Sequence, residues 1–359
     1  MRKYLTAWAA ALLCLLLLSG CAEQQQDIPV DPAPQPPVEL PQEEPEPAPP
    51  ALTSPLTGLE MDESLAGKRP YAVMINNVKQ ALPQMGVSKA ELVVEFPTEG
   101  STDRMMAFFY DVADIPAIGT VRSSRDYFLD YAQAVDAIYL HYGGSPQAYA
   151  AIKARGIDNL DGINGRVDSL LYWRDKERAR KNGSEHSVFT SGEKILHTVA
   201  ELKVRTDSKK AGDFFAFGTA DMASGEAAEK VTLPFSNYIT PVFAYDAESG
   251  RYLREEYGAA HVDAAYGNTQ LSVKNLFVLF TRVSAISGDS AGRLSIATSG
   301  EGDGLYITDG RALPVTWQKA DNDSFVQFRT ADGKPLTVNA GNNWIAVLGT
   351  SKKDKVTLS

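Results

Sequence analysis

The chain has 359 residues, of which 44% are hydrophobic, and its formal net charge is −10. This length suggests two domains, with enough apolar residues to build cores without cross-links. The acidic balance argues against general nucleic-acid binding, which needs a basic face, and we expect no nucleic-acid partner.

The first twenty residues have the pattern of a bacterial signal peptide. Arg2 and Lys3 supply positive charge, and an apolar run from Trp8 to Leu18 follows. Small residues then lie directly before Cys21, as in a lipobox, so we expect Cys21 to carry lipid, palmitate included. The predicted location is the extracytoplasmic face of the bacterial membrane. The alternative, a retained signal anchor, normally needs a longer apolar run.

Removal of residues 1–20 changes the composition of the mature chain. Loss of Arg2 and Lys3 lowers the formal net charge from −10 to −12. The two cysteines are Cys14, which is removed, and Cys21, which is predicted to be acylated. The mature chain therefore has no free thiol, and disulfides, thiol chemistry and cysteine-based metal sites are excluded.

Residues 22–54 form an acidic, proline-rich segment. It contains seven acidic residues, ten prolines and no lysine or arginine. Such a composition cannot bury enough apolar surface to fold, and its prolines favour an extended spacer of up to about 100 Å. We therefore predict a disordered stalk over 21–54 that holds the globular part away from the membrane.

Residues 55–225 alternate between strand and helix patterns. Short apolar runs predict buried strands at 71–77, 91–96, 105–110 and 136–141. Apolar residues at helical spacing predict helices over 123–134 and 191–202, and another helix that Ser145 caps, with Pro146 at its first position. This alternation predicts an α/β domain.

After residue 230 the pattern changes to strands and turns. Apolar runs at 276–283 and 344–348 predict strands, and Asp309-Gly310 and Asp332-Gly333 predict hairpin turns. The glycine-rich run at 300–304 is no dinucleotide-binding motif, because no helical pattern follows it. We predict a smaller, mainly antiparallel β (α+β) domain over 230–350, joined to the first domain by a linker at 222–229.

The stretch from Ile118 to Asp126 joins an apolar run to two arginines with two serines between them. If a helix begins near Ser123, its free backbone N–H groups, the serine hydroxyls and the guanidiniums of Arg122 and Arg125 point at one place. That arrangement would hold a phosphate or a carboxylate. The alternative is a capped helix start with solvated arginines.

Further polar residues lie at the ends of the predicted strands, where ligands bind in α/β sheets. The predicted ligand-binding residues are Arg104, Arg122, Ser123, Ser124, Arg125, His141, Gly143 and Gly144. The candidate catalytic residues are Glu95, Glu99 and Asp103. The alternative is an internal ion-pair network that only fixes the loops, since carboxylates and arginines also satisfy each other.

Common catalytic motifs are missing from the sequence. It contains no Gly-x-Ser-x-Gly, His-Glu-x-x-His or P-loop motif. His141, His186, His197 and His261 lack the spacing of zinc ligands, so we expect no metal and no cofactor. The basic stretch at 173–181 is interpreted as a solvated loop, with the rim of an anion pocket ending at His186 as the alternative.

Several motifs of the chain occur together in a known family. In the first predicted domain they are Asn76-Asn77, Glu95, Glu99-Gly100 with Arg104, Ile118 to Arg125, His141 to Pro146 and Trp173-Arg174-Asp175. In the second they are Asp309-Gly310, Thr316 to Lys319 and Asn339 to Ile345. Over about 55–350 these motifs resemble the YerB-like lipoproteins of Gram-positive bacteria. The resemblance implies an extracytoplasmic lipoprotein with a two-part domain of unknown function. Ser184 to Ser187 departs from the family's Pro-His-Asn, so no role for His186 is implied.

A shorter series of motifs is similar in order and spacing to the LytR–CpsA–Psr cell-wall ligases. The series consists of Thr102 to Met106, Ser124 to Asp126 and His141 to Gly144. In those enzymes arginines hold a polyprenyl pyrophosphate while a glycopolymer passes to peptidoglycan, and an aspartate precedes a strand. A second arginine-bearing segment of that family is not evident here.

These observations favour a lipid-anchored protein of uncharacterised function that binds an anionic cell-wall precursor or polymer through its arginines. One alternative is a phosphotransferase-like enzyme that acts on polyprenyl-pyrophosphate-linked precursors. In that case Asp103 would hold Mg²⁺ or act as a base. Another alternative is an envelope scaffold that binds no small ligand.

Overall fold

The structure, a computed structural model, describes residues 51–210 and 212–359. The predicted signal peptide, Cys21 and all but the last residues of the predicted stalk lie outside the described residues. Residues 51–359 belong to one compact unit. In the described part of the chain, no helix combines the length and the apolar character that crossing a membrane requires.

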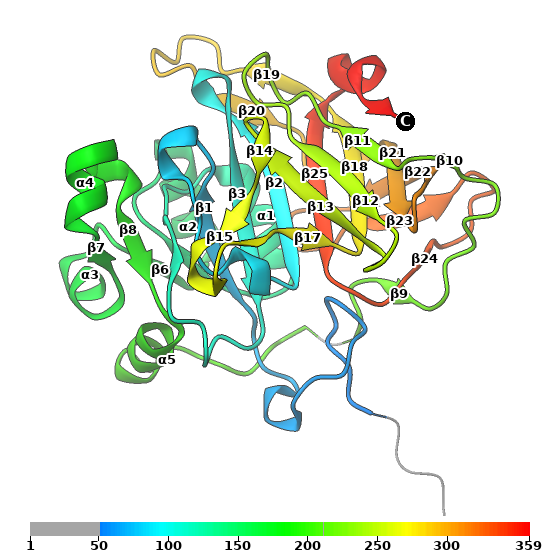
Figure 1. The fold of residues 1–359 in the computed structure, drawn as a ribbon. Coiled ribbons are helices and arrows are strands. Elements are labelled where there is room, and N and C mark those ends of the chain that lie inside the picture. The colour runs from blue at the N-terminus through cyan, green and yellow to red at the C-terminus, as the bar shows by residue number, and fades with distance from the viewer. Residues whose placement is uncertain (1–50, 211) are drawn as a thin grey trace, which may run out of the picture. The chain divides into compact units, whose positions relative to one another are not determined.

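One eleven-stranded sheet runs through the protein (Figure 1), in the order β10-β22-β21-β18-β25-β2-β3-β1-β5-β6, with β23 paired to β22. The strands from the first half are β1 (Tyr71–Asn76), β2 (Leu92–Thr98), β3 (Thr102–Phe109), β5 (Ile138–His141) and β6 (Asn159–Asp161). Those from the second half are β10 (Glu226–Ala227), β18 (Asn275–Thr281), β21 (Gly300–Thr308), β22 (Arg311–Lys319), β23 (Gln327–Thr330) and β25 (Asn343–Gly349).

A second sheet of six strands comes from the later part of the chain. Its strands are β11 (Lys230–Thr232), β12 (Val242–Asp246), β13 (Arg251–Glu256), β14 (Ala259–Ala260), β17 (Ser272–Val273) and β26 (Thr357–Leu358). A three-stranded sheet consists of β4 (Ile118–Gly119), β7 (Trp173–Arg174) and β8 (Val188–Thr190). Three two-stranded sheets pair β9 (Ala216–Phe217) with β24 (Thr337–Val338), β15 (Val262–Asp263) with β16 (Thr269–Gln270), and β19 (Val283–Ala285) with β20 (Leu294–Ile296).

All α-helices of the described residues lie before residue 202. They are α1 (Asp126–Ala134), α2 (Pro146–Arg155), α3 (Gly165–Leu171), α4 (Lys176–Asn182) and α5 (Gly192–Glu201). The short 3₁₀ helices are Glu63–Leu65, Lys79–Ala81, Val87–Lys89, Glu99–Ser101, Ser184–His186, Ala264–Tyr266 and Thr350–Lys355. The predicted fold class, an α/β part followed by a smaller, mainly antiparallel part, is confirmed.

Strand β25 connects the two parts of the large sheet. It pairs in parallel with β18 on one side and with β2 on the other, so Asn343 lies opposite both Asn275 and Leu92. Strands β18 and β25 are almost wholly buried, as their continuous apolar runs indicate for strands covered on both faces. The domain boundaries at 55–225 and 230–350 stay a prediction, and the sheet is continuous across them.

Two apolar clusters cover the two faces of the large sheet. On β3, Met105 and Ala107 belong to one cluster, and Met106 and Phe108 belong to the other, as the two-residue repeat of a strand requires. The first cluster includes residues of α3, α5 and the six-stranded sheet, and the second includes residues of α1 and α2. In Figure 1, β12 and β13 lie in front of the sheet and α1 lies behind it.

Most predicted elements of the first half are present with slightly shifted ends. The predicted strands correspond to β1, β2, β3 and β5. The Ser145 hydroxyl accepts a hydrogen bond from the Ala148 amide at the start of α2, and Ser191 caps α5 in the same way through the Lys194 amide. The predicted basic loop at 173–181 instead forms β7 and α4, which Asp175 caps through the Arg178 amide.

Candidate functional site

The segment from Arg122 to Arg125 is extended, and the prediction of a helix from Ser123 is wrong. Helix α1 begins at Asp126, and Arg125 lies at its N-cap in extended conformation. The Arg122 amide donates to the Met74 carbonyl (3.0 Å), and the Ser124 amide donates to the Gly143 carbonyl (2.9 Å). These N–H groups pair with neighbouring backbone, because extended pairing satisfies them where a first helical turn would not.

Arg104 and Arg125 form hydrogen bonds within the protein. Arg104 is buried, and its Nη1 donates to the Ser123 carbonyl (2.7 Å). Arg125 Nε donates to Glu99 Oε2 (3.0 Å), and Arg125 Nη2 also contacts Glu99 Oε1. Arg125 Nη1 donates to the Ser124 carbonyl (2.7 Å). Both side chains therefore brace the backbone of the arginine segment.

Glu99, Arg104 and Arg125 lie behind this segment, and their charges shift one another's pKa values. Burial alone would raise the pKa of Glu99, but hydrogen bonds and charge from Arg125 outweigh burial and lower the pKa to about 2. Burial and the charge of Arg125 lower the pKa of Arg104 to about 10. All three groups are therefore ionised at neutral pH, and together they carry a net positive charge.

Arg122 lies at the surface, beside a cavity of about 460 Å³ that we name the Arg122 cleft. Its lining includes the polar residues Arg122, Ser123, Arg174, Ser184 and Glu185 and the glycines Gly143 and Gly144. Tyr149 and Ile163 also line it, with 39% and 64% of their surfaces exposed. The cleft therefore combines two guanidiniums with an exposed ring and an exposed aliphatic side chain.

Within residues 51–210 and 212–359, the hydrogen bonds of the two cleft arginines go to carbonyl oxygens. Arg122 Nη1 donates to the Glu185 carbonyl (3.3 Å), and Arg174 Nη1 donates to the Ser184 carbonyl (2.5 Å). The Arg174 guanidinium also lies 4.8 Å from the centre of the Tyr142 ring. Among the described residues, neither arginine forms a salt bridge with a carboxylate.

Glu185 moderates the positive charge of the cleft. A backbone hydrogen bond, then the charges of His186, Arg122 and Arg174, lower the pKa of the Glu185 carboxyl. Glu185 is therefore ionised at neutral pH and attracts both arginines through solvent. Because half of its side chain is exposed, water screens much of that attraction.

His141, Gly143 and Ser124 shape the floor of this region. The buried His141 ring contacts the Gly143 carbonyl through Nδ1 (2.8 Å) and Asn159 Oδ1 through Nε2 (3.1 Å). The Gly143 amide donates to Asp161 Oδ1 (2.9 Å). The hydroxyl of Tyr139 donates to that of Ser124 (2.8 Å). Each of these groups therefore has a hydrogen-bond partner within the protein.

Glu95 and Asp103 lie apart from the Arg122 cleft. On β3, Asp103 shares a face with Met105, whereas Arg104 shares a face with Met106. Glu95 is 0% exposed and Asp103 is 1% exposed, and neither lines the Arg122 cleft. The residues of the single cleft that the sequence analysis predicted are therefore divided between a surface cleft and the interior.

Glu95 and Asp103 belong to a group that we name the buried carboxylate cluster, which consists of Glu95, Asp103 and Glu256. Arg254 Nη2 donates to Glu95 Oε1 (2.7 Å) and to Glu256 Oε2 (2.7 Å). Asn77 Nδ2 donates to Asp103 Oδ2 (2.8 Å). One oxygen from each carboxylate lies within 4.8 Å of the others, which is a donor set that can hold a hard cation.

Burial dominates the electrostatics of the carboxylate cluster. Burial, then contact with Glu95 and its charge, raises the pKa of Asp103 well above its ordinary value. His261 contacts Arg254 and Gln84, and burial followed by the charge of Arg254 lowers its pKa well below the ordinary value. The imidazole is therefore neutral, and Arg254 supplies the positive charge of this region.

The structure sorts the predicted site residues into three groups. The first group lines the cleft and consists of Arg122, Ser123, Gly143 and Gly144. The second group supports the cleft from within and consists of Glu99, Arg104, Ser124, Arg125 and His141. The third group, Glu95 and Asp103, lies apart from the cleft. The role of each residue in function stays a prediction.

Sequence reasoning missed several of the residues described above. It treated Arg174 as part of a solvated basic loop and gave the rim of an anion pocket only as the alternative, although the motif Trp173-Arg174-Asp175 was a usable signal. Glu256 and Arg254 carried no local signal, because Arg254 is 159 positions from its partner Glu95.

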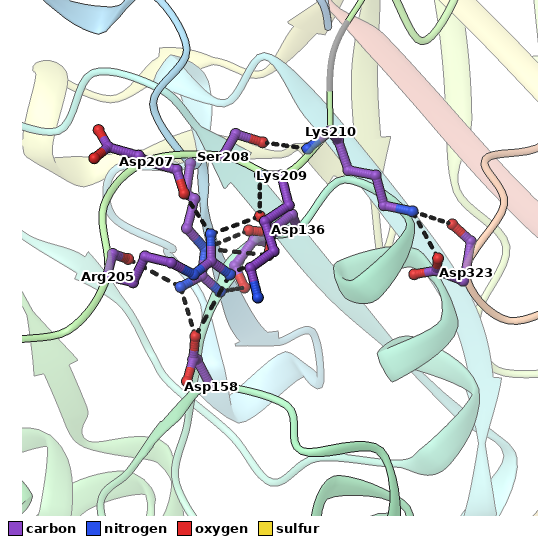
Figure 2. A network of polar contacts seen from close by, with 10 residues as sticks. Asp136, Asp158, Arg205, Asp207, Ser208, Lys209, Lys210 and Asp323 are labelled. Atoms are coloured by element: carbon purple, nitrogen blue, oxygen red, sulfur yellow. Dashed lines mark hydrogen bonds and ion pairs between the residues drawn. The ribbon is translucent and has the colours of Figure 1, made fainter.

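A second basic cavity, of about 320 Å³, lies near Arg69, Arg205 and Lys210. Figure 2 shows that two of its basic side chains are engaged with carboxylates. Arg205 Nη2 lies 2.7 Å from Asp136 Oδ1, and Lys210 Nζ lies 2.8 Å from Asp323 Oδ2. Arg69 Nη1 lies 2.7 Å from Asp158 Oδ2. Most of its guanidiniums are therefore paired with carboxylates, so the Arg122 cleft is the stronger candidate for binding an anion.

Comparison with known proteins identifies the family. Residues 56–205 match the N-terminal domain, and residues 231–345 the C-terminal domain, of the protein of unknown function DUF3048. YerB of Bacillus subtilis (strain 168), which is named as a lipoprotein, is 28% identical over 352 residues, or 97% of this chain and 96% of YerB. The crystal structure of the YerB protein from Bacillus subtilis matches with a TM-score of 0.75 and 27% identity, over 86% of this chain and 99% of that chain. The chain therefore belongs to the DUF3048 family and, as its motifs predict, is a relative of the lipoprotein YerB.

Proposed function

We propose that this protein is a lipid-anchored envelope protein that binds an anionic cell-wall precursor or polymer in the Arg122 cleft. The observation that carries the proposal is the placement of Arg122 and Arg174 at one cavity without carboxylate salt bridges among the described residues. A guanidinium offers several donors in a fixed plane, which suits phosphate and carboxylate oxygens.

The surroundings of the two arginines favour the same function. Arg104 and Arg125 lie behind the cleft, where their internal hydrogen bonds fix the backbone of Ser123 and Ser124. Their positive charge is only partly neutralised by Glu99. A bound anion would therefore meet a fixed site with positive charge in two layers, and little reorganisation would oppose binding.

The apolar edge of the cleft favours a ligand that is more than a bare ion. Tyr149 and Ile163 are among the exposed large apolar side chains of the described residues, and both line the cavity. A sugar ring or a lipid segment next to an anionic group would cover them while the anion meets the arginines. Cell-wall precursors and anionic wall polymers have this combination.

The enzyme alternative receives less support from the geometry. A phosphotransferase of the predicted kind needs Asp103 and the arginines at one reacting group. Asp103 instead lies in the buried carboxylate cluster, on the opposite face of β3 from Arg104. The binding function requires no such shared position, so it is the function that the site supports best.

Isothermal titration calorimetry with inorganic pyrophosphate and with a glycerol phosphate polymer tests the proposal. In the variant Arg122→Ala with Arg174→Ala, each lost charged hydrogen bond costs about 1.5–3 kcal/mol, so affinity should fall by at least about 100-fold. Glu185→Gln removes the competing carboxylate and should raise affinity several-fold. Binding of the polymer but not of pyrophosphate would identify a polymer ligand.

The matched control is Arg166→Ala, which removes an exposed arginine paired with Glu201 outside the cleft. It should leave binding unchanged, and all variants should keep the unfolding midpoint within about 2 °C, because exposed side chains contribute little to stability. Equal binding by wild type and the double variant would contradict the proposal, as would an equal loss in Arg166→Ala.

A further inference from the structure

The buried carboxylate cluster joins distant parts of the chain. Glu95 is on β2 and Asp103 on β3, both in the first half, whereas Glu256 ends β13 in the second half. These residues are 0%, 1% and 2% exposed. The cluster therefore lies inside the contact between the large sheet and the six-stranded sheet that covers it.

The charges of this cluster do not balance. Three carboxylates face Arg254, which is the cation that forms salt bridges with Glu95 and Glu256. His261 is held neutral by burial and by Arg254. With all carboxylates ionised, the cluster has an uncompensated charge of minus two, and a buried charge without a partner is strongly unfavourable.

Two oxygens of the cluster are also without hydrogen-bond donors. Among the described residues, Asp103 Oδ1 and Glu256 Oε1 are buried and have no partner. The other oxygens are occupied, since Glu95 Oε2 accepts from Trp344 Nε1 (2.9 Å) and Asp103 Oδ2 accepts from Asn77 Nδ2 (2.8 Å). Buried acceptors normally have a partner, so these two oxygens indicate a ligand that supplies positive charge.

We propose that Glu95, Asp103 and Glu256 bind one hard divalent cation, Ca²⁺ in preference to Mg²⁺, which fastens the six-stranded sheet to the large sheet. A divalent cation cancels the remaining charge, and carboxylate oxygens are its usual ligands. The sequence analysis expected no metal from the spacing of histidines and cysteines, and carboxylates on three separate strands fall outside that pattern.

The burial of the cluster supports the preference for Ca²⁺. Mg²⁺ gives up its waters reluctantly and usually keeps several of them, whereas Ca²⁺ accepts protein carboxylates in a flexible geometry. Glu95, Asp103 and Glu256 are at most 2% exposed, so an ion here takes most of its ligands from the protein. The site is separate from the Arg122 cleft and does not depend on the proposed function.

Trp344 provides a direct optical test, because its indole N–H binds Glu95. The full chain, purified in detergent and freed of metal with EDTA, is titrated with Tb³⁺, which resembles Ca²⁺ in size and charge preference. Indole excitation should produce Tb³⁺ emission that Ca²⁺ suppresses at lower concentration than Mg²⁺. Trp344→Phe should remove at least about nine tenths of this emission, and Trp173→Phe, which changes a tryptophan on β7, should keep it.

Thermal unfolding gives an independent measurement. In Ca²⁺ at about 100 times its Kd, the wild-type midpoint should rise by roughly 5 °C over the EDTA-treated protein. Asp103→Asn should unfold at or above the EDTA-treated wild-type midpoint and show no response to Ca²⁺, because the substitution removes one buried charge. Glu256→Gln should behave in the same way if Asp103→Asn fails to fold, and the exposed Asp303→Asn should respond as wild type does.

Either of two results would overturn the proposal. One is an unfolding midpoint that neither EDTA nor Ca²⁺ changes, which would mean that protons alone neutralise the cluster. The other is Tb³⁺ emission that persists in both Trp344→Phe and Asp103→Asn, which would place the ion elsewhere. Because anion binding in the Arg122 cleft is measured with different variants, failure here leaves that function untouched.

Discussion

The ion pair of Glu99 and Arg125 makes a prediction about stability and its dependence on pH. Arg125 Nε donates to Glu99 Oε2 (3.0 Å), and the same arginine holds the Ser124 carbonyl behind the Arg122 cleft. Glu99→Gln keeps the size of the side chain and removes its charge. We expect this variant to be less stable at pH 7 because the partly buried guanidinium loses its ionised partner.

The magnitude follows from the pKa of Glu99. Burial raises this pKa, but Arg125 more than offsets burial and brings it from the ordinary 4.5 to about 2. That difference corresponds to at most about 3.4 kcal/mol of stability. Because 21% of the Glu99 side chain is exposed, water screens the pair, and we expect a loss of roughly 2 kcal/mol.

The pH dependence has a defined sign. A carboxyl with a lowered pKa in the folded state contributes its full stability above pH 4.5 and loses it as the pH falls toward 2. About two fifths of the contribution should remain at pH 3 and about a tenth at pH 2. The difference between wild type and Glu99→Gln should therefore shrink from roughly 2 to about 1 kcal/mol between pH 7 and pH 3.

Urea unfolding at pH 7 and at pH 3, followed by circular dichroism, measures this difference. Glu301→Gln is the matched control, since Glu301 is an exposed carboxylate on β21, and it should change stability by less than about 0.5 kcal/mol at both pH values. A loss in Glu99→Gln that is equal at both pH values would refute the ionic account. So would a loss at pH 7 no larger than that of the control.

Two further predictions concern packing and acylation. Gly192→Ala should lower the free energy of unfolding, measured in urea, by about 3 kcal/mol or more, because a Cβ there would lie 1.5 Å from the Val112 carbonyl oxygen. This loss is expected although alanine favours helices. The control Gly165→Ala, which has open space at the start of α3, should not lower it. Metabolic labelling with an alkyne fatty acid should mark wild type and Cys14→Ser but not Cys21→Ser, and a labelled Cys21→Ser would show that the lipobox interpretation is wrong.

The sequence predicts the elements whose signals are local. The apolar runs of β1 and β5 and the serine caps of α2 and α5 each lie within a few residues, so composition and spacing are sufficient to find them. The start of α1 was misplaced because Arg122 and Ser124 pair with Met74 and Gly143, and those partners are distant in the sequence. Tertiary pairing outweighed a plausible local helix start.

The candidate site shows even more clearly that local sequence signals do not reveal tertiary contacts. The arginine motif points to the segment beside the cleft, but only the structure separates Arg122, which lines the cleft, from Arg104 and Arg125, which support it from within. Glu95 and Asp103 were grouped with the arginines because all of them lie at the ends of predicted strands. The alternation of side chains along β3 separates Asp103 from Arg104, and sequence spacing alone does not show which face each segment covers.

The two halves of the chain depend on each other because both contribute strands to the large sheet. Strand β2 is paired on one side with β3 and on the other with β25, so without the second half its backbone would form an exposed edge. Glu95 would also lose Arg254 and Trp344, which supply its charged and neutral donors. A first half expressed alone would therefore expose an edge strand and two acidic groups placed for burial, even though its arginine segment is complete. The ligand binding that we propose for the Arg122 cleft would thus depend on the second half, which keeps the sheet behind the cleft intact.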